Sequence, residues 1–208
     1  RVALGQESGH IYSRNTNPTV RAFEDKVKVL EGAEAATSFS SGMAAISNTL
    51  ATFLRPGDRI VSIKDSYGGT NVIFNEFLPP LGIKVALCKT GDYAELETEI
   101  AKGCTVLYLE TPTNPTIKII DIKRLAAKAH QVGAIVVVDN TFATPINQLP
   151  LELGADITLH SASKYLGGHA DALGGVICGS AELVEKVYHY REINGATLAP
   201  MDAYSLLR

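Results

Sequence analysis

The chain has 208 residues, of which 46% are apolar and 20% are charged, which is the composition of a globular protein with a large hydrophobic core. Its net charge is −3 and no basic run exceeds two residues, which argues against nucleic acid or an anionic membrane as a partner. No apolar stretch approaches the roughly 20 residues of a membrane span. Because no charged-then-apolar signal segment opens the sequence, we expect a cytoplasmic protein.

Residues 1–17 are polar and show no regular periodicity, so we expect an irregular N-terminal arm. Residues 18–208 are expected to form one domain. Asn17 and Pro18 predict the start of its first helix, because Asn favours the N-cap and Pro the first helical position, and Gly32 predicts its end. The sequence begins without a methionine and stops inside a predicted helix, so we expect a piece of a longer protein.

The rest of the chain alternates between short apolar strands and helices. Strands are predicted at 35–39, 59–63, 83–87, 105–109, 135–138, 157–159 and 174–178. Helices are predicted at 42–53, 70–77, 92–101, 121–132, 146–153 and 181–193, of which 146–153 has the weakest pattern. This alternation predicts an α/β fold, with a mostly parallel sheet covered by helices on both faces.

Polar residues stand directly after several of these strands, at Ser41 and Gly42, Tyr67, Asn114, Asp139 and Lys164. Ligands of such sheets bind at the carboxyl ends of the strands. We therefore expect these residues to gather on one edge of the sheet.

Lys164 follows the strand at 157–159 and precedes a glycine-rich loop. A flexible amine at a strand end with small polar neighbours is the arrangement expected of a Schiff-base lysine. Taken alone, the pattern fits a surface lysine in a glycine-rich turn equally well.

Asp139 ends the run Val136-Val137-Val138, so its carboxylate is expected to be partly desolvated and to need a cation or a donor. A protonated pyridine nitrogen is such a partner, and an Asp that caps the following turn is the alternative. Tyr67 lies on a loop beside glycines, which suits a ring stacked on a flat ligand with its hydroxyl free for proton transfer. Packing on the sheet edge is the alternative for Tyr67.

The turn at Ser41 and Gly42 places free N–H groups at a helix start, which is a phosphate seat or an ordinary strand-to-helix turn. The prolines around Asn114 either hold its amide in a fixed place or form only a turn. Neither a GxxxxGK[ST] loop nor a GxGxxG after the first strand occurs, which disfavours nucleotide-dependent chemistry. Together with Lys164 and Asp139, these features are the parts of a pyridoxal phosphate site.

We expect no metal site. Cys88, Cys104 and Cys178 lie in apolar, strand-like segments without a CxxC pair, so we interpret them as buried free thiols. His160 and His169 lack the i, i+4 or carboxylate partners of a metal or triad site, so we interpret both as structural.

A set of motifs occurs in one order: Tyr12-x-Arg14-x-x-Asn17-Pro18-Thr19, Ser41-Gly42-Met43, Glu110-Thr111-Pro112-x-Asn114-Pro115, Asp139-Asn140-Thr141-Phe142 and Ser161-x-Ser163-Lys164-Tyr165-x-Gly167-Gly168-His169. With these motifs the chain closely resembles the Cys/Met-metabolism family of fold-type I pyridoxal phosphate enzymes. The resemblance implies pyridoxal 5'-phosphate as the cofactor and a cofactor-binding large domain at residues 18–208. Nothing in the chain matches the family's small C-terminal domain, which carries the arginine that binds the substrate carboxylate.

The resemblance also implies a role for each site residue. Lys164 would form the Schiff base and then move protons, Asp139 would pair with the pyridine nitrogen, and Tyr67 would stack on the ring and act as an acid. The phosphate would be held by Ser41, Gly42, Met43, Ser161 and Ser163, with Asn114 near the ring hydroxyl. Tyr12 and Arg14 would reach the phosphate of the neighbouring subunit, which implies a homodimer with shared sites, usually within a homotetramer.

The implied reaction is γ-elimination on a small sulfur amino acid, first of all cleavage of cystathionine to cysteine, ammonia and 2-oxobutanoate. γ-Replacement on an activated homoserine is the next choice and γ-elimination of methionine the third, because methionine γ-lyases typically carry Cys where this chain has Gly69. A reading of a different class is an inactive cofactor-binding fragment.

Overall fold

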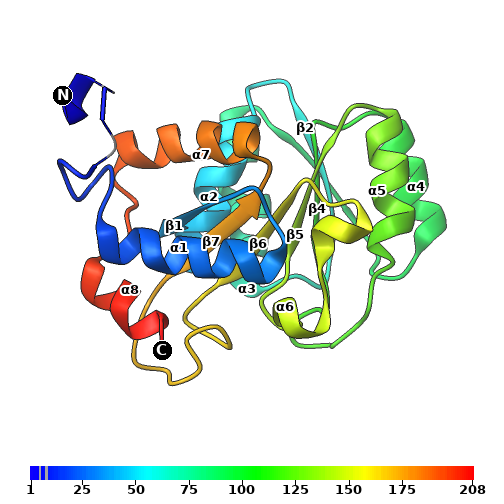
Figure 1. Cartoon of the computed structure of the whole chain (residues 1–208). Coiled ribbons are helices and arrows are strands. Elements are labelled where there is room, and N and C mark those ends of the chain that lie inside the picture. The colour runs from blue at the N-terminus through cyan, green and yellow to red at the C-terminus, as the bar shows by residue number, and fades with distance from the viewer. Residues whose placement is uncertain (5, 8) are drawn as a thin grey trace.

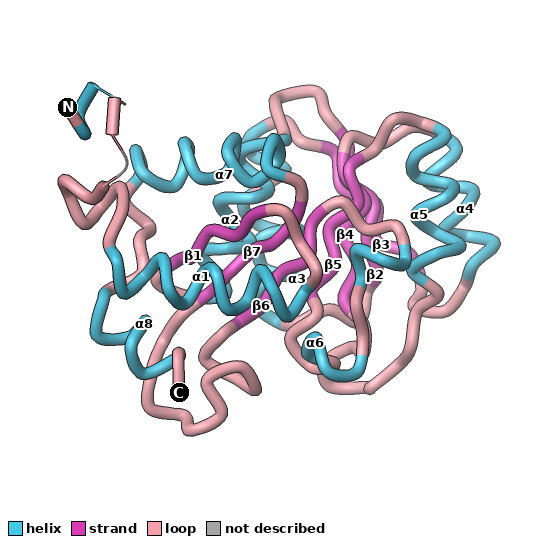
Figure 2. Tube along the Cα trace, in the orientation of Figure 1, coloured by secondary structure: helices cyan, strands magenta, loops and turns pink. Residues whose placement is uncertain are grey.

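Seven strands form one sheet in the part of the chain that the computed structural model describes, residues 1–4, 6–7 and 9–208 (Figures 1 and 2). They are β1 (Ala35–Phe39), β2 (Arg59–Ile63), β3 (Lys84–Cys88), β4 (Val106–Glu110), β5 (Ile135–Asp139), β6 (Ile157–Ser161) and β7 (Gly175–Gly179). Their order is β1-β7-β6-β5-β4-β2-β3. Among these strands β7 alone points opposite to the other six, so the predicted, mostly parallel sheet is confirmed.

The α-helices are α1 (Pro18–Glu31), α2 (Gly42–Phe53), α3 (Gly68–Val72), α4 (Tyr93–Ala101), α5 (Ile122–Gln131), α6 (Thr144–Asn147), α7 (Ala181–Asn194) and α8 (Pro200–Leu206). Short 3₁₀ turns lie at Val2–Leu4, Pro79–Leu81 and Pro150–Leu153, and a π-helical turn lies at Ile73–Phe77. No helix in the described part of the chain is both long and apolar enough to cross a membrane.

Helices cover both faces of the sheet, as predicted, because each strand sends alternate side chains to opposite sides. Along β4, Val106 and Tyr108 join the apolar cluster that contains residues of α2 and α7. Leu107 and Leu109 join the cluster that contains residues of α4 and α5. A third cluster packs α1 and α8 on the end of the sheet formed by β1 and β7 (Figure 1).

The caps of α1 form as the sequence predicts. The side-chain oxygen of Asn17 accepts the N–H groups of Thr19 and Val20 at 3.0 and 3.4 Å, which satisfies donors that the first helical turn leaves unpaired. At the other end Gly32 takes a left-handed conformation with φ of 65°, which ends the helix at little cost because glycine has no Cβ.

Three segments differ from the prediction. The helix expected at 70–77 begins earlier, as α3, and continues as the π-helical turn. The helix expected at 146–153 is replaced by α6 and a separate 3₁₀ turn that starts at Pro150, because proline lacks an amide hydrogen and disfavours helical geometry in the residue before it. The arm contains one 3₁₀ turn at Val2–Leu4, while Gly5 and Ser8 lie outside the described residues.

The cysteines are buried free thiols, as predicted. Cys88, Cys104 and Cys178 are each less than one tenth exposed, and none is in a disulfide. Burial raises the pKa of the Cys88 thiol to about 11, so this group stays protonated and unreactive at neutral pH.

Candidate active site

A cleft of about 580 Å³ opens at the edge of the sheet where β2, β4, β5 and β6 end. Its lining includes Ser41, Gly42, Met43, Tyr67, Asn114, Asp139, Ser161, Ser163 and Lys164. These are the residues that the sequence places directly after strands or in the motif around Lys164. The topology thus brings them together from five segments of the chain, as the rule for parallel sheets predicts.

Lys164 stands in the turn after β6. Its backbone N–H donates to Ser161 O at 3.1 Å and its carbonyl accepts from Gly168 N at 2.8 Å, which fixes the main chain under an exposed side chain. Among the described residues the Lys164 ammonium has no carboxylate within salt-bridge distance. A lysine whose main chain is fixed and whose amine is free is well placed to react with a carbonyl group in the cleft.

Asp139 presents a buried carboxylate to the cleft, with 7% of the residue exposed. One oxygen accepts the N–H and hydroxyl of Thr141, the former at 3.0 Å, and the other accepts the Tyr108 hydroxyl at 3.3 Å. Burial raises the pKa of Asp139, and the Thr141 donors oppose that change. A desolvated carboxylate that has only neutral donors fits a protonated ring nitrogen, because a cation would lower its pKa again.

The first turn of α2 lies against the end of β6. Ser41 caps the helix by accepting the Ala44 N–H at 3.1 Å. A Cβ on Gly42 would lie 2.6 Å from Cβ of Ser161 and 2.9 Å from its Oγ. The free N–H groups of a helix start and a serine hydroxyl therefore lie together, as a phosphate group requires.

Ser163 makes contacts that the sequence does not indicate. Its hydroxyl accepts the Gly174 N–H at 3.0 Å and lies 3.3 Å from Gly174 O. The side chain lines the cleft and also fastens the glycine-rich loop to the start of β7.

Tyr67 is half exposed, and its ring lies close to Gly69. A Cβ on Gly69 would lie 2.8 Å from Cε1 of the Tyr67 ring and 2.8 Å from the Met43 sulfur. The absence of a side chain at Gly69 therefore lets the ring and the thioether approach each other at the mouth of the cleft.

Glu110 is a cleft residue to which the sequence analysis assigns no role. It is 4% exposed, and it is paired in register with Asp139 on the neighbouring strand. Burial and the nearby Asp139 charge raise the pKa of Glu110 to about 7. A glutamate that ends a run of apolar strand residues next to a second strand-end carboxylate is the signal that could have identified it.

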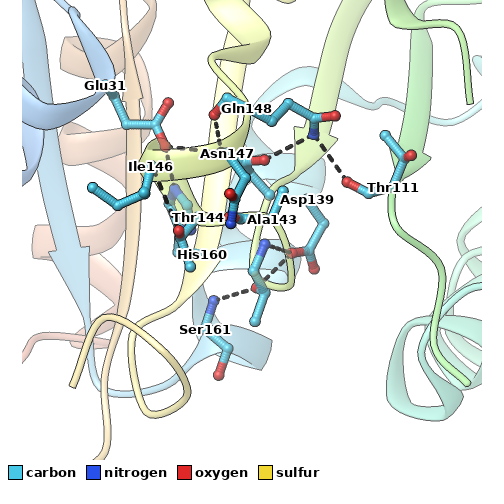
Figure 3. Close-up of polar contacts among 12 residues, drawn as sticks. Glu31, Thr111, Asp139, Ala143, Thr144, Ile146, Asn147, Gln148, His160 and Ser161 are labelled. Carbon is cyan, nitrogen blue, oxygen red and sulfur yellow. Dashed lines mark hydrogen bonds and ion pairs between the residues drawn. The ribbon is translucent and has the colours of Figure 1, made fainter. Parts of the chain in front are cut away.

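A buried polar network lies behind the cleft, at the ends of β5 and β6 (Figure 3). Glu31 of α1 is paired with Nε2 of His160 and accepts from Asn140 Nδ2 at 3.1 Å. Gln148 donates to Asn140 Oδ1 at 2.8 Å and to Thr111 O at 2.9 Å. His160 is fully buried, as expected of a structural histidine, but the expectation that it lacks a carboxylate partner is wrong, because Glu31 is remote in sequence.

Tyr12 and Arg14 are outside the residues that line the cleft. The Arg14 guanidinium donates to the backbone oxygen of Glu192 at the end of α7 and lies 5.2 Å from the centre of the Tyr12 ring. Arg191 and Tyr188 of the same helix donate to Asn15 O at 3.0 and 3.3 Å. In this chain the end of the arm is thus held on α7.

An exposed lysine without a carboxylate partner, a buried carboxylate, an aromatic ring and a helix N-terminus around one cleft are the parts of a pyridoxal phosphate site. The model of the family described as Cys/Met metabolism PLP-dependent enzyme matches residues 2–208. The chain belongs to this family, and pyridoxal phosphate is its cofactor.

The relatives that the chain matches carry several names. The chain is 45% identical to cystathionine gamma-lyase of Bacillus subtilis over 98% of its own length and 54% of the relative, and 43% identical to L-methionine gamma-lyase of Fusobacterium nucleatum over 100% and 53%. A crystal structure of cystathionine gamma synthase from Xanthomonas oryzae pv. oryzae superimposes with a TM-score of 0.94 at 35% identity, covering 98% of this chain and 53% of that one. The chain therefore spans about half the length of these relatives.

Proposed function

We propose that the protein catalyses γ-elimination on cystathionine, giving cysteine, ammonia and 2-oxobutanoate, with residues 18–208 as the cofactor-binding domain. The observation that carries this proposal is the convergence of Lys164, Asp139 and Tyr67 on one cleft at the carboxyl edge of the sheet. The names of the relatives support chemistry at the γ-carbon of a sulfur amino acid.

Bound pyridoxal phosphate would supply an electron sink for a carbanion at the substrate α-carbon. Asp139 would hold a proton on the ring nitrogen. Burial disfavours the charged form of Asp139, so its carboxylate would be stabilised by the positive charge of a protonated ring beside it. The first turn of α2 and the Ser161 hydroxyl would bind the phosphate, and the Asn114 amide would face the ring hydroxyl.

The Lys164 amine would remove the proton from the substrate α-carbon and return protons as the γ-substituent leaves. Its main chain is fixed on both sides, so the free side chain can reach several atoms of the substrate without moving the loop. The Tyr67 phenol, at the cleft mouth, would donate a proton to the departing sulfur.

Gly69 favours cystathionine over methionine as the substrate. Methionine γ-lyases typically carry Cys at this place, and a Cβ here would approach the Tyr67 ring and the Met43 sulfur to 2.8 Å. A cysteine would therefore require the ring and the thioether to move apart. γ-Replacement on an activated homoserine uses the same residues and is the second candidate, supported by the synthase with the same fold.

Product identification after incubation with pyridoxal phosphate and L-cystathionine tests the proposal. We expect cysteine and 2-oxobutanoate, and no turnover by Lys164→Ala. Pyruvate and homocysteine would instead mean β-cleavage. A yellow protein that leaves cystathionine intact would support γ-replacement, for which an O-acyl homoserine with cysteine is the next test, and failure of both would leave a cofactor-binding module without activity.

We further propose that Tyr12 and Arg14 bind the cofactor phosphate of a second copy, in a homodimer that belongs to a homotetramer. Arg14→Ala should then weaken cofactor binding, and a mixture of Arg14→Ala and Lys164→Ala subunits should regain activity because one of the two sites is intact. The matched control is a mixture of Lys164→Ala with Asp139→Asn, which damages two residues of the same cleft. Absence of rescue in verified mixed dimers would contradict the shared site.

A further inference from the structure

Glu110 connects two loops of the cleft through one carboxylate. Its Oε2 accepts the backbone N–H of Tyr67 at 2.7 Å, and its Oε1 accepts the backbone N–H of Asn114 at 2.8 Å. Tyr67 stands after β2 and Asn114 after β4, so the two residues belong to loops that are far apart in sequence. Both oxygens of Glu110 are thus occupied by main-chain donors, and the side chain is buried.

A second link joins the same two loops on their outer side. Lys118 forms an ion pair with Asp65, and the Thr116 hydroxyl donates to Asp65 at 3.3 Å. These groups are partly exposed, so solvent and salt weaken the link. Glu110 is the inner link, where low polarity strengthens a hydrogen bond to a charged group.

We propose that Glu110 is a positioning residue that fixes where Tyr67 and Asn114 stand in the cleft. This inference rests on the proposed function, because only there do Tyr67 and Asn114 act on the cofactor ring. Glu110 acts through their backbones, and it needs no contact with substrate or cofactor.

The clamp requires the ionised carboxylate. An ionised glutamate offers two acceptor oxygens, whereas a protonated one, or a glutamine, turns one of the two positions into a donor. One of the two N–H groups would then face a donor and lose its partner.

The protonation of Glu110 falls in the neutral range, since its pKa is raised to about 7 by burial first and by Asp139 second. The titratable groups around it are Asp139 on β5, the Tyr108 hydroxyl on β4, and Tyr67 and Lys164 of the same cleft. Because the pKa in the fold lies above the usual value of 4.5, the buried group favours folding most below pH 4.5, and this contribution is lost as pH rises through about 7. The clamp therefore forms above about pH 7, at a cost in stability, and loosens below it.

Residue-resolved amide exchange in the cofactor-free protein tests the clamp directly. In Glu110→Gln we expect the amide of Tyr67 or of Asn114 to exchange roughly tenfold faster or more, from the loss of one bond to a charged acceptor. Asp65→Asn is the matched control, since it breaks the outer ion pair and leaves both inner bonds. In the wild type, protection of at least one of the two amides, corrected for intrinsic exchange, should fall as pH drops through about 7; this measurement needs no variant to fold.

Titration with pyridoxal phosphate separates this inference from the proposed function. We expect Glu110→Gln to bind the cofactor more weakly, and to lose less when Tyr67 is already alanine, because coupled residues are not additive. If the wild type fails to bind the cofactor while the amides behave as expected, the proposed function is wrong and the clamp stands. If the wild type binds it, and the two amides stay equally protected in Glu110→Gln and across the pH range, the clamp is wrong.

Discussion

Gly42→Ala tests how closely α2 must approach β6 to form the proposed phosphate-binding site. The new Cβ would lie 2.6 Å from Cβ and 2.9 Å from Cα of Ser161, which is shorter than any relaxed contact. The obstructing atoms belong to a strand end and cannot turn away, so the helix start and the strand must separate. Overpacking of this kind costs about 1–3 kcal/mol, which for a chain of this size lowers Tm by roughly 2–12 °C.

Gly68→Ala is the matched control for this substitution. Gly68 is also the first residue of a helix after a strand, but a Cβ there meets nothing within 4 Å. Thermal unfolding of the cofactor-free variants by circular dichroism, followed by titration with pyridoxal phosphate, measures both effects. We expect Gly42→Ala alone to melt lower and to bind the cofactor about tenfold more weakly, a loss of about 1.4 kcal/mol. Equal melting temperatures and affinities for the two variants would refute the reasoning.

Three further substitutions address the chemistry and the packing. Lys164→Ala should abolish the visible absorbance and the hydride-reducible bond of the cofactor-loaded protein; a reduced adduct on another lysine would overturn this assignment. Asp139→Asn should lower kcat about 100-fold through lost electrostatic stabilisation, with little change in KM, in steady-state kinetics. Arg191→Met should reduce the free energy of unfolding by about 3–5 kcal/mol, measured in urea, because the buried guanidinium lies 3.8 Å from Glu24 and donates to Ser38 O at 3.1 Å. A smaller loss than in Arg191→Lys would argue against that buried pair.

The fold follows from local patterns that need no partner from elsewhere in the chain. Apolar runs bounded by turn residues located every strand, and the cap at Asn17 located the first helix. The pattern failed where two local preferences compete, as around Pro150, where apolar periodicity favours a helix and the proline ring forbids its continuation. Periodicity alone cannot decide such a conflict.

The cleft was predictable to the extent that its residues stand at strand ends. Asp139 and Lys164 carry that signal themselves, because a charged group directly after a buried strand must find a partner or water. The Glu31–His160 pair gives no such signal, since its members are 129 residues apart and meet only after α1 packs on the sheet. Glu110 could be located from the sequence, but its role depends on two backbone N–H groups whose direction only the folded loops define.

The charge of the cleft bears on the role of the arm. Among the residues that line the cleft in the described part of the chain, Asp139 and Glu110 are acidic and Lys164 is the one fixed cation. If Lys164 bonds to the cofactor carbonyl, the phosphate dianion is balanced only by the roughly half positive charge at the N-terminus of a helix. An added arginine is therefore expected.

In the proposed dimer Arg14 would be that arginine, and only weak contacts would have to break first. The Arg14 guanidinium makes two contacts at the surface: it donates a hydrogen bond to the backbone oxygen of Glu192, and it lies over the face of the Tyr12 ring. Both that bond and a bond to a phosphate oxygen involve the charged guanidinium, but only the bond to phosphate joins two opposite charges. A guanidinium can make two such bonds to one phosphate, so the exchange favours transfer of Arg14 to a phosphate wherever a second copy brings one within reach.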